Sequence, residues 1–88
     1  MSAPPITVYS ASWCPYCQRA KALLREKGLA FTEIDVDEDP GRRADMLARS
    51  GRRTVPQIFI GDRHVGGFDD LYASDRSGEL DRWIQGDR

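Results

Sequence analysis

The sequence predicts an α/β fold: a single domain with a four-stranded mixed sheet, helices on both faces, and the element order β-α-β-α-β-β-α. Three observations lead to this prediction. The chain of 88 residues is long enough for one modest core and too short for two. Strand-like runs at residues 6–9 and 31–36 flank a helical run, as in a parallel β-α-β unit. Two further strand-like runs, 57–60 and 63–66, are separated by a short turn, which indicates an antiparallel hairpin.

The predicted domain covers residues 1–88, and residues 1–4 at its start are expected to form a flexible lead-in. The first strand, Ile6–Tyr9, alternates in polarity and contains β-branched residues. The helix after residue 14 is predicted to end near Gly28, because glycine commonly follows the last helical turn. The residues expected on its apolar face are Cys17, Ala20, Leu23 and Leu24.

The second strand, Phe31–Val36, precedes a helix whose two ends are clearly marked. Asp39 is the predicted N-cap and Pro40 the first helical residue, since each is favoured at that position. Gly51 is predicted to end this helix. The inward stripe is expected to consist of Ala44, Leu47 and Ala48.

The second half of the chain contains the hairpin and the last helices. Gly61-Asp62 is the predicted two-residue turn, because glycine at the first central position suits a hairpin. A helix containing Leu71 and Tyr72 follows, and a short final helix lies around residues 79–85. The core residues expected from this half are Phe59, Leu80, Trp83 and Ile84. A compact thioredoxin-like fold has this order of elements.

Composition and charge exclude several classes of function. Hydrophobic residues make up 40% and charged residues 31% of the chain, as in ordinary globular proteins. The formal net charge of -1 argues against nucleic-acid or anionic-membrane binding, which relies on a basic surplus. The chain has no apolar stretch of about 18 residues and no secretory signal pattern at its start. We therefore expect a cytoplasmic protein with no nucleic-acid and no membrane partner.

The two cysteines, Cys14 and Cys17, carry the clearest chemical signal. At the start of a helix their thiols lie one above the other, close enough to form a disulfide. Backbone N–H groups and the helix dipole favour an anion there, so we expect Cys14 to ionise more readily than a free cysteine. A structural zinc site is an alternative, but it needs four ligands and the only histidine is His64. The pattern predicts a dithiol redox centre.

Three motifs in this order resemble the glutaredoxins, specifically the small bacterial dithiol kind: Cys14–Cys17, Thr54–Ile60 and Gly66–Tyr72. The resemblance extends over nearly the whole chain. It implies a thioredoxin-like fold and an enzyme that uses glutathione as a co-substrate. It also implies that no cofactor and no metal ion is bound permanently.

The resemblance also implies which residues contact glutathione. In the family, the proline equivalent to Pro56 is cis and faces the active cysteine, so that the N–H and C=O of Val55 can pair with an extended tripeptide. The N-terminus of the next helix would bind the γ-glutamyl end, with the Asp69 carboxylate near its ammonium group. The implied glutathione-binding residues are Tyr16, Thr54, Val55, Pro56, Gly67, Phe68 and Asp69.

The roles of the residues at two positions beside the cysteine motif, 11 and 13, are left open by the sequence. Many glutaredoxins carry a lysine three residues before the first cysteine, where this chain has Ala11. That lysine would favour the thiolate and pair with the glycyl carboxylate of glutathione. Here those tasks fall to the helix N-terminus and to Arg19, Arg52 or Arg53 as candidates. Trp13 could shape substrate access or cover the end of the sheet.

The predicted function is glutathione-dependent reduction of protein disulfides and protein–glutathione mixed disulfides through the Cys14/Cys17 dithiol. The expected partners are glutathione and disulfide-containing or glutathionylated proteins, and the protein is expected to act as a monomer. Three alternatives remain. One is a glutaredoxin-like electron donor reduced by thioredoxin reductase. Another is a carrier of an iron–sulfur cluster held by Cys14 and glutathione. The last is a thioredoxin-like interaction module with inert thiols.

Overall fold

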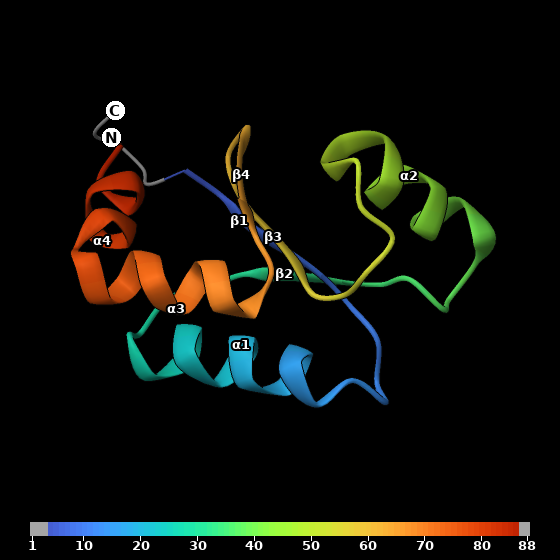
Figure 1. Ribbon diagram of the computed structural model, residues 1–88, viewed down its shortest axis with the longest axis horizontal. Helices are drawn as coiled ribbons and strands as arrows, with labels where there is room; N and C mark the ends of the chain where they lie inside the picture. The colour runs from blue at the N-terminus through green and yellow to red at the C-terminus, as the bar shows by residue number, and fades with distance from the viewer. Residues whose placement is uncertain (1–3, 87–88) are drawn as a thin grey trace.

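The computed structural model describes residues 4–86, so the predicted lead-in lies outside the described residues apart from Pro4. The elements follow the predicted order, and the predicted short final helix is a separate helix after the one that contains Leu71 (Figure 1). The elements are β1 (Ile6–Ser10), α1 (Pro15–Glu26), β2 (Thr32–Asp35), α2 (Pro40–Ser50), β3 (Gln57–Ile60), β4 (Arg63–Gly66), α3 (Phe68–Ser77) and α4 (Glu79–Ile84).

The four strands form one mixed sheet in the order β2-β1-β3-β4. Strand β1 is parallel to β2 and antiparallel to β3, and β4 is antiparallel to β3. Helices α1 and α3 lie on one side of the sheet and α2 on the other (Figure 1). This arrangement confirms the predicted thioredoxin-like fold. Within residues 4–86 no helix is long and apolar enough to cross a membrane.

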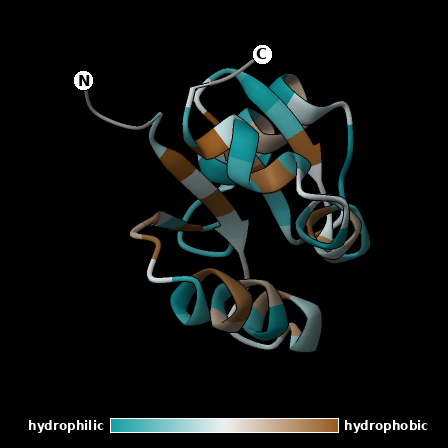
Figure 2. Cartoon of the chain, turned by 90° about the vertical axis from the view of Figure 1, so that its left-hand side faces the viewer, coloured by the Kyte–Doolittle hydropathy of each residue, from teal (hydrophilic) through white to brown (hydrophobic). Residues whose placement is uncertain are grey.

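The strands alternate between two cores, one on each face of the sheet. Figure 2 shows hydrophobic residues alternating with paler ones along β1. The buried residues of the core beneath α1, α3 and α4 are Ile6, Val8, Ala20, Leu24, Ile58, Ile60, Leu71 and Leu80. Those of the second core, on the α2 side, are Tyr9, Ala11, Cys14, Cys17, Val36, Met46 and Phe59. Both cysteines therefore belong to the smaller core.

The predicted ends of α2 are confirmed, but its predicted inward stripe is wrong. Asp39 accepts a hydrogen bond from the Arg42 N–H at 3.0 Å, Pro40 begins the helix, and Gly51 ends it. The predicted stripe of Ala44, Leu47 and Ala48 is exposed, whereas Met46 is fully buried.

Polar contacts explain why α2 turns its other side to the sheet. The Tyr9 hydroxyl donates to the Asp45 carboxylate and accepts a hydrogen bond from Arg49 at 3.0 Å. The Arg49 guanidinium also lies over the Phe59 ring, 4.2 Å from its centroid. One face of α2 contains Asp45, Met46 and Arg49. Polar and aromatic contacts on this face therefore help to set the orientation of α2, which its hydrophobic periodicity alone did not predict.

The inward face of α1 also differs in one residue from the prediction. Leu23 is only partly buried, whereas Lys21 is 6% exposed. The Lys21 ammonium pairs with the Glu33 carboxylate of β2 at 2.7 Å, and Glu33 accepts a further hydrogen bond from Ser10. A buried ammonium group is tolerated when a counter-charge accompanies it.

Replacing Glu33 with glutamine should lower the free energy of unfolding by about 1–3 kcal/mol, because the buried Lys21 ammonium loses its counter-charge. The hydrogen bonds from Lys21 and then Ser10 hold the pKa of Glu33 below its usual value of 4.5. A lowered folded-state pKa means that the stabilisation is full above the usual value and is lost as the pH falls through the folded-state pKa. Denaturant titrations of both proteins at several pH values measure the difference.

Glu26, which is exposed on α1, the helix of Lys21, provides the control. Glu26→Gln removes a carboxylate that makes no ion pair within residues 4–86. We expect the difference in the free energy of unfolding between Glu33→Gln and the unsubstituted protein to shrink as the pH falls. If that difference stays constant at acidic pH, the stabilisation does not come from this pair.

Candidate functional site

Cys14 is the N-cap of α1, and Pro15 is the first helical residue. Proline suits this position because its missing N–H would have no helical partner. The Cys14 sulfur accepts a hydrogen bond from the Cys17 N–H at 3.2 Å. A backbone donor and the positive end of the helix dipole thus converge on this sulfur, an arrangement that stabilises a thiolate.

The two thiols are free, and their surroundings differ. Cys14 is 4% exposed, and Cys17 is completely buried one turn further along α1. Burial, followed by the hydrogen bond with Cys14, raises the pKa of Cys17 to about 12. Cys17 is therefore a protonated thiol near neutral pH, behind a more accessible Cys14 that has a donor at its sulfur.

The loop before β3 approaches Cys14 from across the sheet. The Val55–Pro56 peptide bond is cis, as the family resemblance implied. The Val55 carbonyl oxygen lies 3.6 Å from the Cys14 sulfur, so the carbonyl faces the thiol. The Val55 N–H has no hydrogen-bond partner within residues 4–86 and remains available to an extended main chain.

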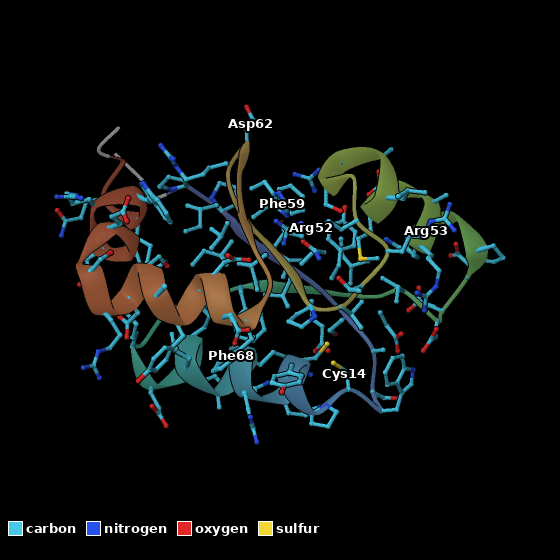
Figure 3. The ribbon with its side chains drawn as sticks, in the orientation of Figure 1. Cys14, Arg52, Arg53, Phe59, Asp62 and Phe68 are labelled. Carbon is cyan, nitrogen blue, oxygen red and sulfur yellow. The ribbon has the colours of Figure 1, made fainter. Side chains whose placement is uncertain are left out.

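A groove of about 320 Å³ lies beside this loop and brings together segments that are far apart in the sequence. Figure 3 shows Cys14 at the start of α1 and Phe68 at the start of α3, on the same side of the molecule. The Tyr16 and Phe68 rings are 6.2 Å apart between centroids. The lining residues are Tyr16, Arg52, Thr54, Val55, Pro56, Gln57, Gly67, Phe68, Asp69 and Asp70. Every residue that the resemblance implied for glutathione lines this groove.

Two lining residues, Asp70 and Gln57, were not predicted from the sequence. Asp70 accepts a hydrogen bond from the Gly67 N–H at 3.0 Å and pairs with Arg52 at 3.4 Å. Its place three residues after the N-cap of α3 is a capping signal that the sequence does contain.

Gln57 holds the cis-proline loop from within β3. Its side-chain amide donates to the Thr54 carbonyl at 3.0 Å and to the Thr54 hydroxyl at 3.2 Å. Its carbonyl oxygen lies 2.7 Å from Nε2 of His64 on β4. Gln57 is 1% exposed. It is the only polar residue of an otherwise apolar strand, and this pattern could have indicated a buried side chain with a hydrogen-bonding role.

The three candidate arginines lie in different places. Arg52 lines the groove, Arg19 lies over the Tyr16 ring at 5.2 Å from its centroid, and Arg53 lines a different pocket on the α2 side. Ala11, which occupies the position of the family lysine, is fully buried in the core around the cysteines. No group of three or more metal-binding side chains is gathered within residues 4–86.

Trp13 does not cover the end of the sheet. Its side chain is 65% exposed, and its indole N–H donates to the Asp37 carboxylate at 2.8 Å. The ring of the residue before the nucleophile is thus held by Asp37, and neither side chain lines the groove.

A dithiol at the N-terminus of α1, facing a cis-proline loop on a thioredoxin-like sheet, defines a thiol–disulfide oxidoreductase. The family model described as Glutaredoxin matches residues 6–65. A glutaredoxin of Pseudomonas aeruginosa is 54% identical over 78 residues, which cover 89% of this chain and 93% of the relative. Glutaredoxin 3 of Escherichia coli is 54% identical over 76 residues, covering 86% and 92% of the two chains. The chain belongs to the glutaredoxin family.

Solved structures agree with this assignment. The solution structure of a glutaredoxin from Brucella melitensis has a TM-score of 0.84 and 54% identity, and the match covers 96% of this chain and 91% of that chain. The crystal structure of a buckwheat glutaredoxin–glutathione complex has a TM-score of 0.85 and 34% identity, with coverage of 94% and 78%.

Proposed function

We propose that the protein is a glutathione-dependent oxidoreductase that reduces protein–glutathione mixed disulfides and protein disulfides. The observation that carries this proposal is the groove beside Cys14, which offers main-chain, anionic and cationic contacts for a tripeptide. The buckwheat relative forms a complex with glutathione, which supports the same ligand for this chain. We propose that the chain acts as a monomeric single domain in the cytoplasm, where the glutathione pool keeps thiols reduced.

The proposed fit follows the chemistry of the tripeptide. The free Val55 N–H and its carbonyl suit the cysteinyl main chain of glutathione. The first N–H groups of α3, at Phe68 and Asp69, suit the γ-glutamyl carboxylate, and the exposed Asp69 carboxylate suits the ammonium group. Arg52 is the proposed partner of the glycyl carboxylate, because it lines the groove and is half-exposed. Tyr16 and Phe68 would flank the ligand.

In the proposed reaction with a glutathionylated protein, the Cys14 thiolate attacks the glutathione sulfur. A Cys14–glutathione disulfide forms, the old sulfur–sulfur bond breaks, and the protein leaves as a thiolate that takes a proton from water. A second glutathione, as a thiolate, then attacks the bound glutathione sulfur. Glutathione disulfide leaves, and Cys14 returns as a thiolate. The two-electron reduction of the substrate is balanced by oxidation of two glutathione units to their disulfide.

With a protein disulfide, the attack of Cys14 breaks the substrate's sulfur–sulfur bond and forms a mixed disulfide between the two proteins. One substrate sulfur leaves as a thiolate and takes a proton from water. Cys17 then loses its proton and attacks the Cys14 sulfur, which releases the second substrate thiol and leaves a Cys14–Cys17 disulfide. Two glutathione molecules reduce that bond. The 3.2 Å contact between the Cys17 N–H and the Cys14 sulfur keeps the two residues close enough for this step.

A comparison of reductants tests the proposal. Activity is measured on a glutathione mixed disulfide with either glutathione plus glutathione reductase or thioredoxin reductase as the electron source. We expect turnover with glutathione and little with thioredoxin reductase alone. Reduction by the flavoenzyme but not by glutathione would instead support the electron-donor alternative, and a brown protein after anaerobic purification would support the iron–sulfur alternative.

A further inference from the structure

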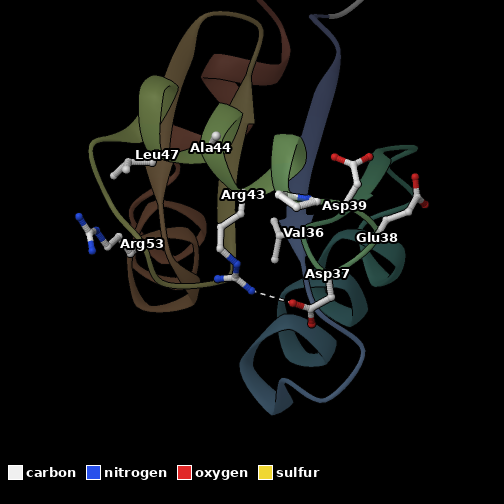
Figure 4. Close-up of a pocket in the computed structure, with 9 residues that line it drawn as sticks. Val36, Asp37, Glu38, Asp39, Arg43, Ala44, Leu47 and Arg53 are labelled. Atoms are coloured by element: carbon white, nitrogen blue, oxygen red, sulfur yellow. Dashed lines mark hydrogen bonds and ion pairs between the residues drawn. The ribbon is translucent and has the colours of Figure 1, made fainter.

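A second concave surface lies beside α2 and shares no lining residue with the groove (Figure 4). It is a pocket of about 710 Å³ between α2 and the loops that precede and follow it. We call it the α2 cleft; its lining residues are Val36, Asp37, Glu38, Asp39, Pro40, Arg43, Ala44, Leu47 and Arg53. Neither the reaction described above nor the glutathione groove uses these side chains.

The α2 cleft is continuous with the active-site loop. Asp37 on its wall accepts a hydrogen bond from the Trp13 indole at 2.8 Å and another from Arg43 at 2.8 Å. These two donors, Arg43 first, hold the pKa of the Asp37 carboxyl below its usual value. Trp13 directly precedes Cys14, so an exposed aromatic ring is fixed between the nucleophile and the cleft.

The apolar part of the α2 cleft comes from the side of α2 that faces away from the sheet. Leu47 is 37% exposed and Ala44 is exposed beside it, although both were expected in the core. Trp13 and Leu47 are two of the four large hydrophobic side chains that are exposed within residues 4–86. Exposed apolar side chains gathered beside a reactive group are typical of an interaction surface.

The charges of the α2 cleft favour one kind of occupant. Glu38 and Asp39 both pair with Arg42, and Asp37 pairs with Arg43. Arg53 forms no ion pair within the described part of the chain, residues 4–86, and Figure 4 shows its guanidinium at the edge of the pocket. Glu38 and Asp39 share the single guanidinium of Arg42, so that side of the cleft has one carboxylate in excess. Figure 4 shows these carboxylates on the side of the pocket opposite to Leu47 and Arg53. The side at Leu47 and Arg53 therefore offers an apolar wall and one unpaired cation.

We propose that the α2 cleft binds the polypeptide of the substrate protein, and that it prefers a segment with an apolar and an acidic side chain next to the target cysteine. The apolar side chain packs against Leu47 and Ala44, and the carboxylate pairs with Arg53. Glutathione and the substrate polypeptide then occupy separate surfaces on the two sides of Cys14. This inference rests on the proposed function and adds the substrate preference to it.

The test measures the turnover of three substrates by the unsubstituted protein, with glutathione and glutathione reductase as the electron source. One is a glutathionylated peptide with leucine and glutamate next to its cysteine, and another has serine and lysine in those places. The third, the mixed disulfide of cysteine and glutathione, has no polypeptide. We expect kcat/KM to be higher for the leucine–glutamate peptide than for the serine–lysine peptide by about fivefold or more.

Variants on the α2 cleft locate the preference. Leu47→Glu and Arg53→Glu should each lower kcat/KM for the leucine–glutamate peptide about fivefold and change that for the cysteine–glutathione disulfide less than about twofold. Arg82→Glu is the matched control, because it makes the same charge change on α4, at the opposite end of the molecule from α2 (Figure 1). Arg82→Glu should leave kcat/KM unchanged for all three substrates.

The outcomes separate the two proposals. Equal kcat/KM values for the two peptides would overturn docking in the α2 cleft. The same holds if both cleft variants lower kcat/KM equally for the leucine–glutamate peptide and for the cysteine–glutathione disulfide. In either case the proposed function stands. No turnover of the cysteine–glutathione disulfide by the unsubstituted protein would overturn the proposed function and, with it, this inference.

Discussion

Cys14→Ser should abolish glutathione-coupled reduction of a mixed disulfide, with a loss of more than about a thousandfold, because a hydroxyl group is hardly ionised where the thiolate attacks. Cys17→Ser should retain deglutathionylation to within about tenfold of the unsubstituted rate, because that route needs only one thiol and an external glutathione. The same Cys17→Ser variant should lose most of its reduction of protein disulfides. Steady-state assays with a glutathionylated peptide and with a protein disulfide measure both effects.

Alkylation provides an independent measurement of the same asymmetry. The raised pKa of Cys17, about 12, and its complete burial predict that it stays unmodified near neutral pH. Iodoacetamide should therefore modify one thiol per chain rapidly, and mass spectrometry should locate it at Cys14. Two thiols that react at equal rates, or none that reacts, would contradict the assignment of nucleophile and resolving residue, and the second result would support an inert interaction module.

The second large effect is expected at Gly66, where β4 meets the groove. Its φ of +122° lies in a region that residues with a side chain rarely adopt, and a Cβ atom there would lie 2.2 Å from Oδ2 of Asp70. Gly66→Ala should therefore displace the carboxylate that caps α3 at Gly67 and pairs with Arg52. We expect a loss of about 2–4 kcal/mol in the free energy of unfolding and a raised KM for glutathione.

Two variants separate the contributions to that effect. Gly28→Ala also places alanine at a positive φ, +72°, but its Cβ would meet nothing within 4 Å. It should cost only about 1 kcal/mol and leave the KM for glutathione unchanged. Asp70→Ala removes the cap and the ion pair without straining Gly66, so it should cost less stability than Gly66→Ala. Equal stability of Gly66→Ala and Gly28→Ala in denaturant titrations would refute the argument.

The positions of strands and helices could be predicted because their signals are local. Asp39, Pro40 and Gly51 mark the ends of α2 through their own backbone preferences, and all three have the predicted positions. The Gly61-Asp62 turn likewise joins β3 and β4 as predicted. The pattern of alternating or periodic hydrophobicity then sufficed for the sheet and for the buried residues Cys17, Ala20 and Leu24 of α1. The expected core residues Trp83 and Ile84 are only partly buried.

The orientation of α2 could not be predicted in this way. Ala44 and Leu47 are exposed, whereas Met46 is fully buried. Asp45 and Arg49, although also exposed, make the polar contacts with the sheet. The reason is that Tyr9 and Phe59 present a hydroxyl group and an aromatic face to α2, and these satisfy a carboxylate and a guanidinium. Periodicity records hydrophobicity along one helix and contains no information about the partner across the interface.

Local signals in the sequence were sufficient to predict the chemistry of the site: a dithiol at the start of a helix, with the motifs that resemble the glutaredoxins. The tertiary structure decided how the surfaces around Cys14 are divided. It placed Arg52 in the groove and its neighbour Arg53 in the α2 cleft, and it fixed Trp13 between the cysteine and that cleft. The cap position and the N–H donor at Cys14 come from its own neighbours along the chain, whereas a binding surface depends on side chains that packing brings together from distant segments.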